Sequence, residues 1–401
     1  MYKSVWIILT TCVTRRRSFY GWKKRDGFTG GFGICLGQRC GARDERGMRK
    51  SIAVSMILSV IFAVVLTTLC CVLSHQIIRW MKIPADIAEE AYAYMFVVLL
   101  GTGATVFYNM ISNILRALGD SKTPLYFLVF SSVLNIFLDI LFILPLGMGV
   151  AGAAWATILS QFLSAVLSLI VGMRRFEVLH LKKDDFANLG NAMTVHLKTG
   201  FPMGFQMSVM CIGQLAMQMV VNSLGTAAVA GYTAASKADQ LSVLVNNAMM
   251  TAISNYVAQN FGAGKKERIQ QGVRASLIQT ETFNLLMCVG ILLLRHPIVE
   301  LFMFSPTKEI YHYSDVYLTI VAPFYIVLGL LAVYRTAIQS MQNGWAPFAA
   351  CMIELVMRIS ATVGLVGMLG YTSVCIASPM AWFGACALLI PCYYRMMKAW
   401  K

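Results

Sequence analysis

The sequence predicts an all-α polytopic membrane protein that consists of two pseudo-symmetric six-helix bundles, the first of them incomplete. Of its 401 residues, 58% are apolar and 13% are charged, and the mean hydropathy is +0.67, whereas about 25% of residues are charged in an ordinary soluble domain. A water-soluble fold cannot hide this much apolar surface. The other observations behind the prediction are ten long apolar stretches and a repeat that relates the two halves of the chain.

The apolar stretches are long enough to cross a membrane. A hydrocarbon layer about 30 Å thick requires roughly 20 apolar residues in a helix, and Pro, Gly or charged residues mark the ends of the stretches. The connections are short, so large domains outside the membrane are excluded. The ten predicted spans are 52–73, 91–115, 124–147, 150–173, 200–222, 240–261, 273–294, 313–340, 347–369 and 373–394.

The net charge of +15 indicates the topology of a membrane protein rather than binding to nucleic acid. Cytoplasmic connections carry an excess of Lys and Arg. Counted in alternate connections, twenty basic residues lie on one side and five on the other. This bias predicts a multi-pass protein of the plasma (inner) membrane with a cytoplasmic C-terminus. The larger set includes Arg39, Arg116, Arg174, Lys198, Arg335 and Lys398, and the smaller set is Arg79, Lys82, Lys237, Arg295 and Lys308.

Three landmarks recur at nearly one offset along the chain, each at the same place relative to the apolar stretches beside it. The offset spans an even number of predicted helices, so the two halves are expected to be parallel repeats. Such halves usually enclose a central path. The matched pairs are 38–43 with 259–264 and Gly149 with Gly370, both 221 positions apart, and 114–117 plus Pro124 with 337–340 plus Pro347, 223 positions apart.

The repeat also predicts the domain organisation. The second half begins near Gly200, whose counterpart would precede Met1, so one helix of the first half is expected to be absent. Basic residues at 15–17 and 23–25 interrupt the apolar pattern, which indicates that the front of the chain is truncated or wrongly assigned. The alternative is that residues 5–13 form a short amphipathic anchor. The predicted divisions are an irregular segment 1–27, N-lobe helices 28–175, a cytoplasmic linker 176–196 and C-lobe helices 197–401.

Short motifs lie at the ends of the predicted spans and inside them. They are 37–44 (GQRCGARD), 115–124 (LRALGDSKTP), 135–139 (NIFLD), 149–157 (GVAGAAWAT), 200–202 (GFP) and 259–264 (QNFGAG). Together these motifs resemble the multidrug and toxic compound extrusion (MATE) family of transporters, over nearly everything after about residue 28. The resemblance implies a two-lobed exporter that alternates access and exchanges a drug-like, often cationic compound for protons or sodium ions. It also implies that the family's first helix, which carries an acidic coupling residue in many members, is missing.

Ionisable side chains inside hydrocarbon cost roughly 2.5–3.5 kcal/mol on insertion scales, so each one invites a functional explanation. Asp139 lies one helical turn after Asn135 and shares its face, so this pair is a candidate site for the coupling ion; the alternative is a hydrogen bond between helices. Glu354 and Arg358 are spaced for an ion pair within one helix, which predicts a structural or gating role. All four are ion-coupling candidates.

A second set of polar residues is predicted to line a substrate cavity. Gln206, Met210, Gln214 and Gln218 follow one another at every fourth position, and Met and Gln side chains suit promiscuous binding because Met adapts its shape and Gln both donates and accepts. Packing against a neighbouring helix is the alternative. Weaker candidates for the cavity are Asn246 and Tyr325, the latter near the helix-breaking Pro323.

The predicted function is secondary active transport, with no cofactor other than the coupling ion, H⁺ or Na⁺. The eleven cysteines and five histidines show no metal-site spacing, and no hydrolase or phosphate-binding motif is present, so an enzyme is not expected. The expected partners are a small-molecule substrate and membrane lipids, with the chain acting as a monomer. The alternatives are a flippase for a lipid-linked precursor and an inactive truncated transporter. Asp239 is expected to cap a helix.

Overall fold

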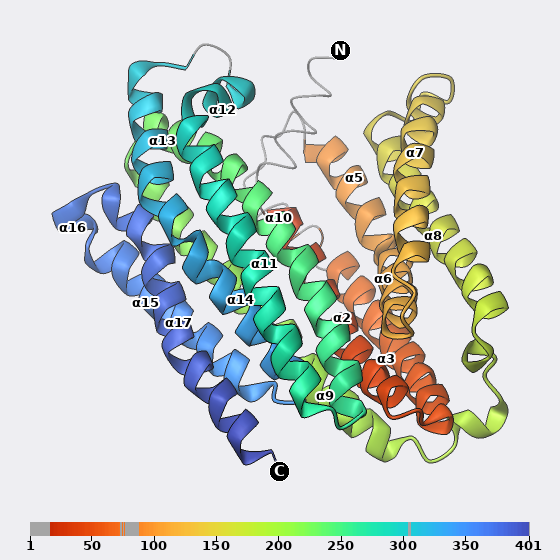
Figure 1. Ribbon diagram of the computed structural model, residues 1–401. Helices are drawn as coiled ribbons and strands as arrows, with labels where there is room; N and C mark the ends of the chain where they lie inside the picture. Colours follow the sequence, from red (N-terminus) through yellow and green to blue (C-terminus); the bar gives the residue numbers. More distant parts are fainter. Residues whose placement is uncertain (1–16, 73, 75, 77–87, 304–305, 401) are drawn as a thin grey trace. The chain divides into compact units, whose positions relative to one another are not determined.

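The computed structural model describes residues 17–72, 74, 76, 88–303 and 306–400, and every regular element within them is a helix (Figure 1). The all-α class predicted from the sequence is confirmed. The chain divides into two compact units, an N-terminal unit Met1–Gly204 and a C-terminal unit Phe205–Lys401.

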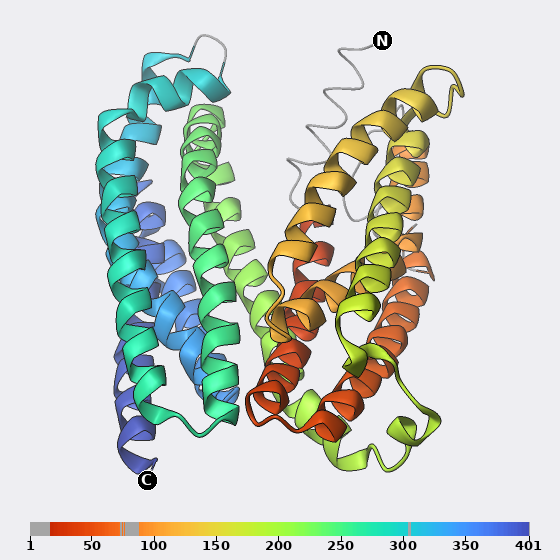
Figure 2. The same cartoon turned by 45° about the vertical axis from the view of Figure 1, so that its right-hand side comes forward.

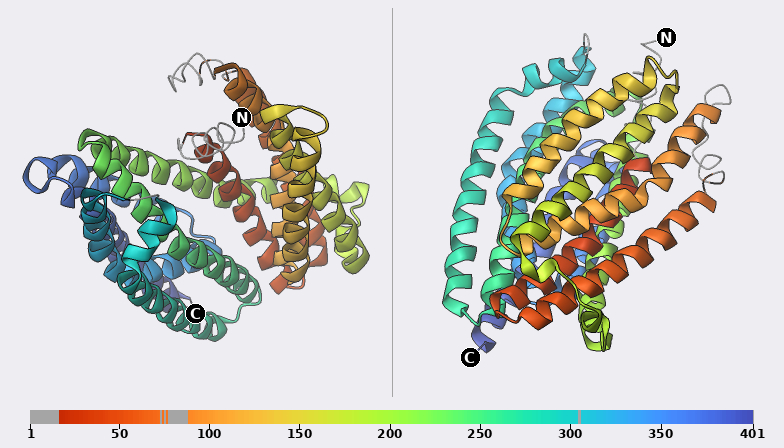
Figure 3. Two further views of the ribbon diagram at one scale, coloured as in Figure 1. Left: turned by 90° about the horizontal axis from the view of Figure 1, so that it is seen from above. Right: turned by 90° about the vertical axis from the view of Figure 1, so that its right-hand side faces the viewer.

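Helix α8 is the central packing partner in the N-terminal unit, because it packs against both α7 and α6 (Figures 2 and 3). Helices α5 and α6 meet at a 41° bend at Gly101. A side chain there would collide with Ile158 of α8, since a Cβ atom would lie 2.1 Å from its Cγ1. The helices are α2 (Arg17–Gly41), α3 (Glu45–Val72), α5 (Ala88–Leu100), α6 (Thr102–Ala117), α7 (Lys122–Ile143), α8 (Gly149–Arg175), η1 (Glu177–Leu179), η2 (Lys183–Phe186) and the first part of α9 (Gly190–Ser223).

Among the described residues, the C-terminal unit has the larger apolar core, to which α10, α11, α13, α14 and α17 contribute buried residues. A short 3₁₀ turn, η3, contains Pro323 and separates α13 from α14, as expected for a proline inside a helical run. The elements are the rest of α9, α10 (Thr226–Gly262), α11 (Lys266–Leu293), α12 (Arg295–Phe302), α13 (Lys308–Val321), η3 (Ala322–Phe324), α14 (Tyr325–Ser340), α15 (Trp345–Gly364), α16 (Val366–Leu369) and α17 (Thr372–Ala399).

Eight helices among the described residues are long and apolar enough to cross a membrane, or nine if the bent pair α5–α6 forms one span. The remaining predicted span, 240–261, lies within α10, which is 37 residues long. Asparagines such as Asn246 and Asn247 interrupt the apolar stretch of α10, which is not among the eight.

The turns that join the helices repeat between the two halves. After α2, the backbone N–H groups of Ala42, Arg43 and Asp44 donate to the carbonyl groups of Gln38, Cys40 and Arg39. The equivalent residues 221 positions later are Ala263, Gly264 and Lys265, and they make the same three bonds after α10. The turn after α6 and the turn after α14 also match, at the offset of 223.

Left-handed backbone conformations recur at the same places. The φ angle is +56° at Arg43 and +69° at Gly264. At the second pair of turns it is +95° at Gly119 and +64° at Gln342. The third landmark repeats as well, with φ angles of +57° at Gly149 and +53° at Gly370. The internal repeat predicted from sequence is therefore present in the backbone of both units.

Several local predictions need correction. Asp239 and Lys237 lie well inside α10, because that helix begins at Thr226; Asp239 is not a helix cap, and Lys237 is not in a connection. Arg335 lies inside α14 rather than in a cytoplasmic connection. The expected irregular segment 1–27 overlaps α2 from Arg17 onward, while 1–16, including the alternative anchor 5–13, lie outside the described residues.

Candidate functional site

Charged and polar side chains gather between the long helices of the C-terminal unit. Helices α10, α11 and α14 pack against one another. On α10, Asp239 and Asn246 are seven residues apart and share a face, as do Glu281 and Asn284 on α11, three residues apart. We call these four residues, with Tyr325 of α14 and Arg358 of α15, the polar cluster.

The centre of the polar cluster is a hydrogen-bonded pair of asparagines. The Nδ2 of Asn246 donates to Oδ1 of Asn284 at 3.0 Å, and the Nδ2 of Asn284 donates to the backbone carbonyl of Tyr325 at 2.9 Å. The three side chains are buried, with exposed fractions of 3%, 0% and 0%. Amide pairs of this kind join membrane helices, at about 0.6–2 kcal/mol per bond. They fix α10, α11 and the beginning of α14 in one arrangement.

Glu281 lies one turn from this pair, and its carboxylate is unsatisfied. Both carboxylate oxygens are buried and have no hydrogen-bond partner among the described residues. Gly329 of α14 makes the space for this side chain, because a Cβ atom there would lie 2.6 Å from Oε1 of Glu281 and 2.4 Å from Nδ2 of Asn284. A buried carboxylate without partners is costly, so its presence in a packed helix bundle calls for a functional reason.

The Glu281→Met variant is expected to be more stable than the parent chain by about 1–3 kcal/mol, because it removes a buried polar group that lacks a partner. Thermal unfolding of the purified protein in detergent measures this. Glu267→Met, at an exposed position of the same helix, is the matched control and is expected to leave the melting temperature nearly unchanged. A lower melting temperature for Glu281→Met would show that the carboxylate stabilises the fold.

A second carboxylate of the polar cluster faces a tyrosine and an arginine. Asp239 lies beside the hydroxyl group of Tyr325 and within electrostatic reach of Arg358, and its Oδ1 is buried without a hydrogen bond to any described residue. Arg358 is 6% exposed. Its guanidinium is packed against Gly213 of α9, where a Cβ atom would lie 3.5 Å from Nη1. Asp239 and Arg358 thus place opposite charges near each other without a direct salt bridge.

The ion pair predicted within α15 is replaced by one between helices. Glu354 pairs with Arg335 of α14, not with Arg358, which lies one turn further along its own helix. Both partners are largely buried, with side-chain exposures of 5% for Glu354 and 11% for Arg335. A guanidinium from a neighbouring helix satisfies Glu354 and joins α14 to α15. The sequence prediction failed because the partner comes from a residue 19 positions away.

In the N-terminal unit, Asn135 and Asp139 lie on α7 at the predicted spacing, but they do not bond to each other. The Nδ2 of Asn135 donates to Oγ1 of Thr157 on α8 at 3.3 Å. Asp139 is half-buried, and its Oδ1 is buried without a partner in the part of the chain that the structure describes. The carboxylate is therefore available to a proton or a cation.

The predicted cavity residues differ in whether their polar groups are already hydrogen-bonded within the protein. Gln206 is buried and accepts a hydrogen bond from Gln339 of α14 at 2.8 Å. It therefore packs against a neighbouring helix, which was the alternative to lining a cavity. Asn246 and Tyr325 belong to the polar cluster. Met210 and Gln214 are half-buried, and Gln218 donates to Asn222 on the same helix at 2.8 Å.

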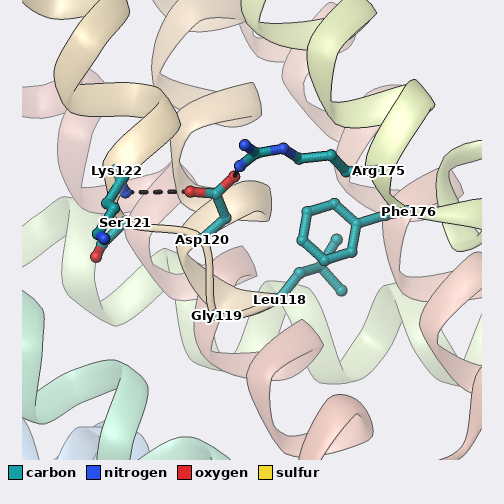
Figure 4. A pocket seen from close by; sticks show the side chains of 7 residues that line it. All are labelled: Leu118, Gly119, Asp120, Ser121, Lys122, Arg175 and Phe176. Atoms are coloured by element: carbon teal, nitrogen blue, oxygen red, sulfur yellow. Dashed lines mark hydrogen bonds and ion pairs between the residues drawn. The ribbon is translucent and has the colours of Figure 1, made fainter.

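Asp120 organises the turn between α6 and α7 (Figure 4). Its Oδ1 accepts from the backbone N–H groups of Lys122 and Thr123, and its Oδ2 accepts from the Thr123 hydroxyl and from Nη1 of Arg175. Burial alone would raise the pKa of Asp120, but these hydrogen bonds and the arginine charge outweigh it and lower the pKa. Asn343 accepts from the N–H of Ala346 in the second half, at the same offset of 223. These loop residues cap helices.

Sequence reasoning missed Glu281, Asn284 and the partner role of Arg335. The signal was present, because each lies inside a predicted span and an ionisable or amide side chain there is rare. Asp239 was missed because the predicted span began one residue after it.

A bundle of membrane-length helices that carries carboxylate oxygens without partners among the described residues is typical of a membrane transporter. A family model, MatE, matches residues 27–141 and 202–363. The chain is 30% identical over 380 residues to the probable multidrug resistance protein YpnP of Bacillus subtilis, covering 91% of this chain and 81% of that protein. The chain belongs to the MATE family of membrane transporters.

Two further comparisons agree. The probable multidrug resistance protein NorM of Thermotoga maritima is 26% identical over 326 residues, which cover 80% of this chain and 70% of that protein. A crystal structure of a MATE protein in the bent conformation superposes with a TM-score of 0.89 at 24% identity and covers 96% of this chain and 86% of that one. The fold is thus that of MATE structures, and the chain is a multi-pass membrane protein of a transporter family, not of an enzyme family.

Proposed function

We propose that this protein is a secondary active transporter that exports small, drug-like, often cationic compounds in exchange for protons or sodium ions. Membership in the MATE family supports this proposal, as do the names of two relatives, which are probable multidrug resistance proteins. The observation that carries the coupling mechanism is a set of carboxylates on the long helices, Asp139, Asp239 and Glu281, each with at least one buried oxygen that has no hydrogen-bond partner among the described residues.

Such carboxylates suit ion coupling for a physical reason. An ionised carboxylate is stable inside a helix bundle only with a compensating partner, and without one it binds a proton or a cation. Ion binding that is favourable in one conformation and unfavourable in the other biases the equilibrium between them. In the proposed cycle, ion entry at Asp139 or in the polar cluster favours the conformation that releases substrate.

The proposal includes the topology and the lobes. The repeat supports two lobes, the proposed helices 28–175 and 197–401, with access alternating between them. The proposed linker 176–196 overlaps the beginning of α9, which starts at Gly190. The excess of basic residues on one side supports a plasma membrane location with a cytoplasmic C-terminus. Within the C-terminal unit, Met210, Gln214 and Gln218 are the proposed contacts to substrate.

Transport into inverted membrane vesicles tests the function. Vesicles that contain the protein are given an acid interior, and in a separate experiment a sodium-rich interior, in the presence of a cationic fluorescent dye. The dye is expected to accumulate inside under one of the two gradients and to leave when an ionophore collapses that gradient. Accumulation that is equal with and without the gradients would contradict antiport. Accumulation of an anionic dye alone would contradict the cationic substrate class.

A further inference from the structure

A shallow pocket of about 440 Å³ lies where the turn between α6 and α7 meets the end of α8. Figure 4 shows Asp120 held between this turn and Arg175, with Phe176 and Leu118 beside it. The pocket combines basic, acidic and apolar groups, and none of the predicted transport residues lines it. Its lining residues are Leu118, Gly119, Asp120, Ser121, Lys122, Arg175 and Phe176.

The charges of the pocket leave it with an excess of hydrogen-bond donors. The one carboxylate, Asp120, already accepts four hydrogen bonds. Arg175 is exposed, and its bonds to described residues come from Nη1 alone, toward Asp120 and Thr123, although a guanidinium has five N–H donors. The Lys122 ammonium is exposed and has no hydrogen bond to any residue that the structure describes. With two cations and one anion, the pocket suits a singly charged phosphate diester.

An exposed apolar helix surface begins at the edge of this pocket. Helix α7 packs against α8 on one side, but only Thr123, Pro124 and Ser131 of α7 are buried, so its other side is exposed. In the first two turns after Lys122, the side chains of Leu125, Tyr126 and Val129 are 56%, 67% and 57% exposed. A phosphate group at the pocket would thus sit beside an apolar surface that can receive hydrocarbon chains.

We propose that this pocket and the adjoining surface of α7 bind an anionic phospholipid. The phosphate lies between Lys122 and Arg175, and an acyl chain lies along Leu125, Tyr126 and Val129. Lipid rather than a free phosphate compound is the proposed occupant because the apolar surface continues from the pocket. The second half lacks the basic residue of this pocket. The position equivalent to Lys122 there is Trp345, which is 71% exposed and has no charge.

Lipid titration of the purified chain in neutral detergent tests the proposal, with native mass spectrometry as the readout. Short-chain phosphatidylglycerol is expected to bind the parent chain more tightly than phosphatidylcholine of equal chain length. Lys122→Gln is expected to weaken phosphatidylglycerol binding about 5-fold, the loss expected for one basic residue near an anionic lipid. Lys398→Gln, at an exposed lysine near the end of α17, is the matched control and is expected to bind as the parent does.

Three results would overturn the proposal. Equal affinity of the parent and of Lys122→Gln for phosphatidylglycerol would remove the pocket from lipid binding. Equal affinity for the two lipids would show that charge does not select the occupant. If glycerol phosphate displaced an equal concentration of phosphatidylglycerol, the site would bind a free anion and the apolar surface would have no part in binding.

Discussion

Gradient-driven export by the Asp139→Asn variant is expected to fall to the level of vesicles without the protein. Asparagine keeps the shape of the side chain but cannot take up or release a proton, and it binds a cation more weakly because it has no charge. Asp139 is suited to this role because its Oδ1 is buried in a spanning helix without a partner among the described residues. Dye accumulation in inverted vesicles, under the gradient that drives the parent chain, measures the effect.

Two comparison variants separate coupling from folding in this experiment. Asp184→Asn changes an exposed carboxylate in the short helix η2 and is expected to export as the parent does. Asp139→Glu keeps an ionisable carboxyl group and is expected to retain part of the activity. Undiminished export by a correctly folded Asp139→Asn protein would exclude Asp139 from the ion site and leave the polar cluster, with Asp239 and Glu281, as the coupling centre.

The Arg335→Ala variant is expected to lose about 3–5 kcal/mol of stability, because it leaves the buried carboxylate of Glu354 without its partner. This is a large fraction of the 5–15 kcal/mol by which most domains are stable. The yield of folded protein and its unfolding temperature in detergent measure the loss. Since the single variant is expected to fold poorly, the decisive comparison is a double variant, Arg335→Met with Glu354→Met.

The double variant is expected to regain most of the lost stability, because apolar residues of similar size often replace a buried ion pair at little cost. Arg175→Ala, which removes the 59% exposed partner of Asp120, is the control and is expected to cost about 1 kcal/mol or less. If Arg335→Ala cost no more than Arg175→Ala, the pair between α14 and α15 would not stabilise the fold. Restored stability without restored export would assign the pair a role in transport as well.

The fold followed from the sequence because its signals are strong and repeated. Apolar stretches of spanning length leave a membrane protein only helices or a closed barrel, since every backbone N–H group must be bonded within the protein. Landmarks such as Gly149 and Gly370 revealed the duplication from spacing alone, and the same positions have left-handed backbones in both halves.

The site was predicted less completely, and the failures have a common physical cause. Spacing along one helix identifies neighbours such as Glu354 and Arg358, but it contains no information about residues that another helix brings close. Arg335 reaches Glu354 from α14, and Asn284 reaches Asn246 from α11. Asn135 and Asp139 were identified because they share one helix, yet the partner of Asn135 is Thr157 on α8.

Two of the repeated turns, the one after α2 and α10 and the one after α6 and α14, have glycine at the left-handed position in only one of the two halves. A left-handed conformation costs residues other than glycine about 1–2 kcal/mol, and this cost falls on Arg43 in one half and on Gln342 in the other. The equivalent residues, Gly264 and Gly119, adopt the same backbone without it. Each half therefore contains the glycine that would relieve the strain at the equivalent turn of the other half, and a chain with glycine at both copies of each turn is expected to be more stable.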